Sequence, residues 1–432
     1  MKEAQEYKMI HPLLPNQLQK TQETMRMAAE FILRPISRKY DKAEHEPPLE
    51  MEQLNQAAAA QKKQTGMTDD SVKSMDLGGR NLWAVISLEQ MCWGDVGLFL
   101  ARPGTGLGNA AIMAVGNEEQ KSKWGKRWAA MAITEPAAGS DSKNISTTAV
   151  LEGDEWVLNG EKIYVTDGDR CDCVVVWATL NKNMGKTAIR SFLVEKGTPG
   201  FTVARLEKKL GIRASDTATL IFDNCRVPRE NLLGGKEEIE TDVNAAKKSF
   251  GGAMQTFDNT RPMVAGMAIG LGQAALDMTR ALLAEEGYED NFGASIHQQT
   301  AVQRELEMLE AELEAARLLV YKSAWMMDNK MPNSKEASMG KAKAGRIGNK
   351  ISLKCVEICS MQGFSEDHLL EKFSRDSKIL DIFEGTQQIQ QLIVARQVLG
   401  KSSRDLKSVS YTHLRAHETP EHRVCRRLLE KK

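Results

Sequence analysis

The sequence of 432 residues has no excess of charge of either sign, since 58 Lys and Arg residues balance 58 Asp and Glu residues. This balance gives no global field that favours a nucleic acid or a membrane surface as a partner. No apolar run reaches the ~18 residues that a membrane helix needs, and the N-terminus, MKEAQEYKMIHPLLPNQ, lacks the layout of a secretory signal. The 7 cysteines are scattered and odd in number, which indicates reduced thiols and neither a disulfide framework nor a metal site. We expect a soluble, cytoplasmic globular protein of two or three domains.

The texture of the sequence divides the chain into three parts and a tail. Residues 1–128 carry apolar positions at helical spacing, which predicts an all-helical domain. Residues 129–238 form short alternating runs divided by Gly, Asn, Asp and Pro, which predicts a small antiparallel β barrel or sandwich. Within it, Asn159 and Gly160 predict a tight hairpin turn. The predicted fold class is therefore mainly α with an inserted β domain.

Residues 239–400 return to helical spacing and predict a four-helix bundle. Small or apolar residues recur at heptad-like intervals at Leu306, Leu309, Leu313, Ala316 and Val320. Glycines within a helical pattern cost helix propensity and suggest close contact between helices, as at Gly266, Gly270 and Gly272. Residues 401–432 are rich in His and Arg and lack this periodicity. We interpret them as a non-native or disordered tail, although a nucleic-acid arm is an alternative.

One carboxylate lies in an unusual position. In DIFEGTQQIQQLIVARQVLG, Glu384 follows apolar residues and precedes Gly385, which allows a ligand to approach the backbone. Thr386 can cap the amphipathic helix that follows. For an arbitrary glutamate, a solvated loop charge would be the simpler interpretation. The remaining motifs favour a catalytic interpretation.

Several motifs, in order along the chain, resemble those of one family. AMAITEPAAGSDSKN offers small residues, whose backbone N–H groups can reach a ligand, and hydroxyl donors. It closely resembles the flavin-binding stretch of the acyl-CoA dehydrogenases. GEKIYVTDG resembles that family's second flavin strand, RVPRENLLG the end of its β domain, FDNTRPMVAG its substrate-side helix and FEGTQQIQQLIVAR its catalytic turn.

The resemblance implies an N-terminal helical domain, a middle antiparallel β barrel and a C-terminal four-helix bundle, with FAD between them. It also implies α,β-dehydrogenation of an acyl-CoA thioester, a reaction of fatty-acid β-oxidation. Glu384 would remove the α-proton while the β-hydrogen leaves as hydride to flavin N5. Burial raises the basicity of such a carboxylate, and the N–H of Glu384 with a flavin hydroxyl would polarise the thioester carbonyl.

Further site residues are carried over by position. Some family members carry the base on another helix, at the position of Thr260, which cannot act as a base. The flavin-binding residues implied are Met131, Ala132, Ile133, Thr134, Ser140, Tyr164, Val165, Thr166, Thr386 and Gln388. The substrate-binding residues implied are Ser140, Asp258, Thr260, Arg261 and Gly385. Tyr164 stands where most members have Trp, and Asp258 with Arg261 also fits a simple i, i+3 ion pair.

The chain departs from the family where a neighbouring subunit normally holds the FAD pyrophosphate and adenine. The altered positions are Glu289, Thr300, Glu357, Ser360 and Met361. A carboxylate repels a pyrophosphate by about 4 kcal/mol per charge pair at about 4 Å under an intermediate dielectric. We therefore favour a heterotetramer in which a related subunit supplies this contact. A homotetramer with a repositioned adenine site is the alternative.

Other functions remain as alternatives. A non-catalytic scaffold subunit would have lost Glu384, and an acyl-CoA oxidase would be longer. The resemblance implies an electron-transferring flavoprotein as the electron acceptor. The sequence does not identify the acyl group, whose pocket we expect to include Leu98, Phe99 and Met254.

Overall fold

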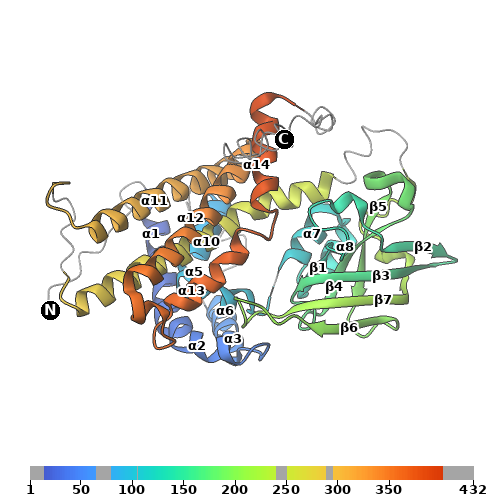
Figure 1. Cartoon of the computed structure of the whole chain (residues 1–432). Coiled ribbons are helices and arrows are strands. Elements are labelled where there is room, and N and C mark those ends of the chain that lie inside the picture. The colour runs from blue at the N-terminus through green and yellow to red at the C-terminus, as the bar shows by residue number, and fades with distance from the viewer. Residues whose placement is uncertain (1–13, 65–78, 105, 240–250, 289–294, 402–432) are drawn as a thin grey trace, which may run out of the picture.

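The computed structural model describes residues 14–64, 79–104, 106–239, 251–288 and 295–401, with only the backbone of 57–64 and 251–259. The predicted tail beyond Lys401 lies outside these residues, as do Glu289 and the side chains of Met254 and Asp258. Figure 1 shows the described chain as a group of long helices beside a curled sheet. Among the described helices, none is both long and apolar enough to span a membrane.

The N-terminal part consists of helices that pack on the bundle and on the sheet. They are α1 (Asn16–Ala28), the π-helical turn η2 (Ala29–Leu33), α2 (Arg34–Lys42), α3 (Leu49–Gln64), α5 (Arg80–Gly94), α6 (Val96–Leu100), α7 (Leu107–Val115) and α8 (Glu118–Trp124). Asn117 caps α8 reciprocally with Gln120, each side chain accepting from the other's backbone N–H. Helix α7 contacts the first strand of the sheet, so this part reaches the β domain.

The middle part is one curled sheet of seven strands. They are β1 (Ala129–Ala132), β2 (Thr148–Glu152), β3 (Glu155–Thr166), β4 (Cys173–Thr179), β5 (Ile189–Glu195), β6 (Phe201–Leu206) and β7 (Thr217–Pro228), with short 3₁₀ turns η3 (Ser142–Asn144), η4 (Lys182–Ala188) and η5 (Arg229–Asn231). Neighbours follow the order β1-β4-β2-β3-β7-β6, and β5 pairs with β4. Of the six described strand pairs, four are antiparallel, and β1 and β2 each pair with β4 in parallel. The core of the sheet consists mainly of Val, Ala, Leu, Phe and Trp side chains. Strands β4 and β5 are buried along almost their whole length and do not alternate.

The predicted hairpin turn at Asn159 and Gly160 is wrong. Strand β3 runs through both residues, and the turn between β2 and β3 lies at Gly153 and Asp154 instead. Gly160 has φ +154°, and its pairing with β7 shifts register after Leu158. The glycine therefore serves a β-bulge, and a Cβ there would lie 2.4 Å from Thr147 Oγ1.

The C-terminal part is a helical bundle. Its helices are α10 (Gly251–Glu285), α11 (Ala301–Asp328), α12 (Ser334–Phe364), α13 (Leu370–Leu380) and α14 (Gln387–Leu399). All five heptad-like residues predicted on α11 are buried. The predicted glycine contacts are also confirmed: a Cβ on Gly270 would overlap the Glu89 carbonyl oxygen, and one on Gly266 would lie 3.2 Å from that of Val85. Helix α10 therefore packs closely on α5, and the predicted mainly-α fold with an inserted β domain is confirmed.

A buried polar junction joins the three parts of the fold. Lys372 on α13 donates to Asp95 Oδ2 at 2.7 Å and to Asp376 Oδ2 at 2.5 Å. Asp95 also accepts from Ser37 on α2, and Asp376 Oδ1 accepts from the N–H of Ile212, which lies between β6 and β7. Both carboxylates raise the pKa of Lys372, although burial opposes them, so the ammonium group remains charged. The junction therefore bonds the N-terminal helices, the sheet and the bundle to one another.

Candidate active site

The turn between α13 and α14 presents Glu384. This residue has φ +56° and Gly385 has φ +93°, so two consecutive residues take left-handed conformations. The Thr386 side chain caps α14 by accepting from the N–H of Ile389, as the sequence predicts. A non-glycine residue at positive φ indicates a local constraint, and such residues are concentrated at functional sites. The backbone of the turn at Glu384 is therefore locally constrained.

Glu384 is partly buried, and its carboxylate lies near the cationic side chains of Arg261 and Lys341. Thr260 Oγ1 on α10 donates to Glu384 Oε2 at 3.0 Å. Loss of contact with water raises the pKa of Glu384, while the Thr260 hydroxyl and the charges of Arg261 and Lys341 oppose this rise. Arg261 is itself buried beside Thr260. The site therefore holds a carboxylate that is more basic than an exposed glutamate.

The backbone of this turn is also held from within the bundle. Lys341 Nζ on α12 donates to the Gly385 carbonyl at 2.8 Å. Gln390 Nε2 donates to the carbonyls of Glu384 and Gly385 at 3.0 and 3.1 Å. Within the described ranges, by contrast, the N–H of Glu384 donates to no other group. That N–H therefore remains available for a ligand next to the carboxylate.

Eight of the ten predicted flavin residues lie on the sheet or on the loop after its first strand. They belong to β1, to the loop after it and to the end of β3. Ala132 and Val165 point into the sheet core, so only their backbone can serve a ligand. Ser140 and Tyr164 are exposed, and Tyr164, at 64 % exposure and φ +57°, presents its ring to solvent. Met131, Ile133, Thr134 and Thr166 are partly exposed beside them. Gln388 is exposed on the first turn of α14.

Two residues that the sequence reasoning missed hold this loop in place. Glu135 is buried and accepts from the backbone and hydroxyl of Ser146 at 2.5 and 2.7 Å, and from the N–H of Thr147 at 2.9 Å. Lys162 Nζ on β3 donates to Glu135 Oε1 at 2.7 Å and to the Ile133 carbonyl at 3.1 Å. Burial opposes ionisation of Glu135, but Lys162 and these donors lower its pKa to about 2. A lysine within an alternating strand pattern was the available signal.

The predicted positions for a neighbouring subunit's nucleotide lie on the bundle. Thr300 caps α11 by accepting from the N–H of Gln303. Glu357 is exposed and pairs with Lys354 at 2.7 Å. Ser360 interrupts α12 with φ +49° and ψ −121°, and Met361 beside it is exposed. Position 360 therefore keeps a backbone conformation that suits glycine, although it carries a serine.

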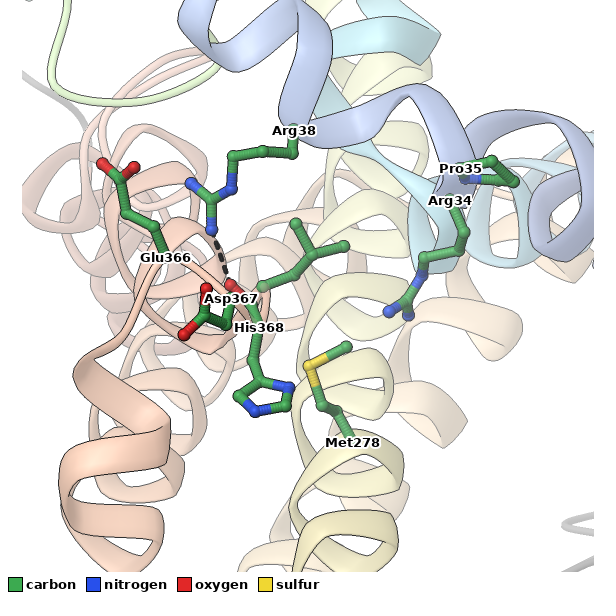
Figure 2. A pocket seen from close by; sticks show the side chains of 8 residues that line it. Arg34, Pro35, Arg38, Met278, Glu366, Asp367 and His368 are labelled. Carbon is green, nitrogen blue, oxygen red and sulfur yellow. Dashed lines mark hydrogen bonds between the residues drawn. The ribbon is translucent and has the colours of Figure 1, made fainter.

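A hollow of about 540 Å³ lies elsewhere in the fold. Figure 2 shows it between α2, α10 and the loop before α13. Arg38 Nη2 donates across it to the His368 carbonyl at 2.6 Å, and Met278 forms part of its wall. None of the predicted site residues lines this hollow. We therefore do not assign the chemistry to it.

The residues at the sheet edge fit a flavin. The Thr134 and Thr166 hydroxyls and the small residues around Gly139 offer donors and close backbone approach, and a Cβ on Gly139 would meet no atom within 4 Å. The carboxylate of Glu135 is turned inward, so it does not repel the electron-rich edge of the ring. The exposed ring of Tyr164 provides an apolar face for a planar ligand.

Comparison with known proteins assigns this three-part fold to the enzymes that oxidise acyl-CoA thioesters. Residues 130–225 match the acyl-CoA dehydrogenase middle domain, and residues 250–399 match the acyl-CoA dehydrogenase C-terminal domain. The chain therefore belongs to the acyl-CoA dehydrogenase family. Members of this family are FAD-dependent flavoproteins, which confirms the predicted cofactor.

Three relatives illustrate the similarity. The mitochondrial short-chain specific acyl-CoA dehydrogenase of Rattus norvegicus is 33% identical, over 92% of this chain and 94% of that protein. The caffeyl-CoA reductase-Etf complex subunit CarC of Acetobacterium woodii is 36% identical, over 75% of this chain and 84% of that protein. The structure of butyryl-CoA dehydrogenase from Megasphaera elsdenii superposes with a TM-score of 0.77 at 29% identity, over 89% of this chain and 99% of that chain.

Proposed function

We propose that this chain converts a short-chain acyl-CoA thioester to the 2-enoyl-CoA, with Glu384 as the base that takes the α-proton. The observation that carries the proposal is the Glu384 carboxylate itself. Glu384 is partly buried, its carboxylate accepts a hydrogen bond from Thr260 at 3.0 Å, and its pKa is raised mainly by burial. A carboxylate in this state is suited to abstract a weakly acidic proton.

The residues around Glu384 suit the other demands of the reaction. The available N–H of Glu384 can donate to the thioester carbonyl and stabilise the negative charge that develops there. Gly385 has no side chain, so the thioester can approach the backbone. The charge of Arg261, buried beside Thr260, favours the anionic form of Glu384 before the α-proton is taken.

The cofactor accounts for the other half of the oxidation. FAD supplies, when bound, the acceptor at flavin N5 for the β-hydrogen, which leaves as a hydride. On this chain we assign the hydroxyls of Thr134, Ser140 and Thr166 to the polar edge of the ring, and the face of Tyr164 to stacking. The backbones of Ala132 and Val165 would complete the contact, and Thr386 and Gln388 would hold the cofactor from α14.

The substitution Glu384→Gln tests the assignment of the base. The amide is nearly isosteric but not basic, so exchange of the α-hydrogens of butyryl-CoA with deuterium oxide should fall at least 100-fold, on the order of a lost general base. Thermal stability should stay unchanged. Glu366→Gln is the matched control, because Glu366 is exposed and pairs with Lys42 at the surface. Exchange by Glu384→Gln at more than a few per cent of the wild-type rate would disprove the assignment.

The names of the relatives support a choice of acyl group and of electron acceptor. Two relatives that are 33% and 32% identical are named short-chain specific. Turnover should therefore be highest with four-carbon substrates and fall with longer chains. The subunit CarC is named as part of an Etf complex, which supports an electron-transferring flavoprotein as the acceptor. Reduction of a purified electron-transferring flavoprotein with butyryl-CoA as donor tests both assignments.

A heteromeric enzyme is a second candidate. It is favoured by the exposed carboxylate of Glu357, three residues before the glycine-like conformation of Ser360. If this face meets a neighbouring subunit's FAD, the carboxylate repels the pyrophosphate. The chain expressed alone should then hold less than one FAD, and a related partner chain should restore it. Glu289→Arg with Glu357→Gln should also raise FAD occupancy; Thr300 is kept, because it caps α11. A homo-oligomer with one tightly held FAD per chain would refute this candidate.

A further inference from the structure

Lys341 is a buried cation next to the turn that carries Glu384. Its side chain projects from α12 and is 0 % exposed. Its Nζ donates to the carbonyl of Gly385, the residue that follows Glu384, at 2.8 Å. Within the described part of the chain, Lys341 has no carboxylate as a direct ion-pair partner. Its hydrogen bond is therefore directed at the backbone of the turn.

Burial of the Lys341 ammonium group carries a desolvation cost. Burial lowers the pKa of Lys341 to about 8, because an apolar environment disfavours the charged form. Asp381 and Glu384 attract the charge from the end of α13 and from the turn, and Arg261 on α10 repels it. An apolar side chain of the same length would avoid this cost. The presence of a lysine therefore calls for another explanation.

The carbonyls of the turn receive donors from two helices. Lys341 approaches from α12, and Gln390, which is also fully buried, approaches from α14. Both bind carbonyls of residues at positive φ, and a Cβ on Gly385 would overlap Gln390 Nε2. The two donors therefore fix the orientation of the peptide groups on either side of Gly385. These peptide groups in turn fix the backbone that carries the Glu384 side chain.

We propose that Lys341 is a positioning residue for Glu384: its ammonium group holds the Glu384–Gly385 turn and favours the ionised carboxylate. This inference rests on the proposed role of Glu384 as the base. It assigns no contact between Lys341 and the substrate. A charge-assisted hydrogen bond of this kind acts through both geometry and electrostatics.

The substitution Lys341→Met tests the inference, with α-hydrogen exchange of butyryl-CoA in deuterium oxide measured against pH. The rate at its optimum should fall roughly 10- to 100-fold, the range that corresponds to one lost charge-assisted hydrogen bond. The acidic limb of the profile should move to higher pH by about one unit, because removal of a nearby cation raises the pKa of a carboxylate. Lys341→Arg should restore most of the rate and the position of the acidic limb. Lys341→Gln keeps a hydrogen-bond donor but lacks the charge, so it should restore part of the rate and leave the limb shifted.

The matched control is Lys343→Met. Lys343 lies on the same helix, but it is partly exposed and pairs with Glu312 at 2.6 Å. The control should exchange at the wild-type rate with an unshifted profile. Lys341→Met should fold and melt at or above the wild-type temperature, because the substitution removes a buried charge.

The outcomes separate this inference from the proposed function. If Glu384→Gln retains exchange, the proposed function fails, and the role of Lys341 fails with it. If Glu384→Gln loses exchange but Lys341→Met keeps the wild-type rate and profile, only the inference about Lys341 is overturned. Unfolding or a much lower melting temperature of Lys341→Met would also overturn it, because the lysine would then serve the fold. A lower rate with an unshifted acidic limb would overturn the electrostatic role.

Discussion

Glu135 and Lys162 form an ion pair of 2.7 Å in which neither side chain is more than 2 % exposed. The carboxylate has three further donors from Ser146 and Thr147. The pair therefore connects the loop after β1 to strand β3, which are the two segments assigned to the flavin. Its position suggests that it holds the shape of the cofactor-binding edge.

Removal of one member of this pair should be costly. Glu135→Gln leaves the Lys162 ammonium group buried without its counter-ion, so the free energy of unfolding should fall by about 3–5 kcal/mol. Denaturation in urea measures this loss, and flavin content should fall with it. Glu152→Gln is the control, because its pair with Arg226 is exposed and should contribute under about 1 kcal/mol. Equal losses in the two variants would contradict the structural role of Glu135.

The hydroxyl of Thr260 should set the pH dependence of the base. Thr260→Val removes a donor to the carboxylate, so the pKa of Glu384, already raised by burial, should rise further. Because exchange requires the ionised carboxylate, activity is lost as the pH falls through that pKa. The acidic limb should therefore move to higher pH by about one unit. Thr260→Ser retains the hydroxyl and should leave the limb in place, and a shift in that variant would argue against the hydrogen bond.

Stability at alkaline pH should report the burial of Lys341. Its pKa is lowered from 10.5 to about 8 in the folded chain, so the unfolded chain binds more protons between these pH values. The penalty is present in full below pH 8 and disappears as the pH rises to 10.5. Wild-type stability relative to Lys341→Met should therefore increase by about 3 kcal/mol over this window. Urea denaturation at pH 7.5 and pH 10.5, with both proteins at each pH, measures the difference, and a constant difference would contradict the prediction.

Replacement of Ser360 by glycine should stabilise the fold. Its φ of +49° with ψ of −121° suits glycine, and a side chain there costs on the order of 1–3 kcal/mol. Ser360→Gly should raise the free energy of unfolding by about 1 kcal/mol. The gain is smaller than the relieved strain, because glycine also gives the unfolded chain more conformational entropy. Ser365→Gly is the control, because Ser365 has φ −73° and ψ +145°, which suit any residue, and its substitution should be neutral or destabilising. Destabilisation by Ser360→Gly would show that the strain is absent.

Local patterns predicted the elements better than they predicted the contacts of the site. The buried positions of α11 followed from spacing alone, and the close approach at Gly270 followed from a glycine within a helix. The turn at Asn159 was wrong because a glycine at positive φ serves a bulge as well as a turn. Lys341 lies 44 positions before Gly385 and on another helix. Its contact depends on how α12 packs against α14, which no local pattern in the sequence records.

The junction of Lys372 with Asp95 and Asp376 bears on how the enzyme admits its substrate. A hinge between the sheet and the bundle would have to break hydrogen bonds among fully desolvated charges, because Ile212 carries the sheet side of the same junction. A rigid-body movement of the sheet away from the bundle would therefore cost much free energy. A substrate would then reach Glu384 through movements of side chains and short loops, with the sheet and the bundle kept in place relative to each other. The same coupling should make the parts melt together in one calorimetric transition.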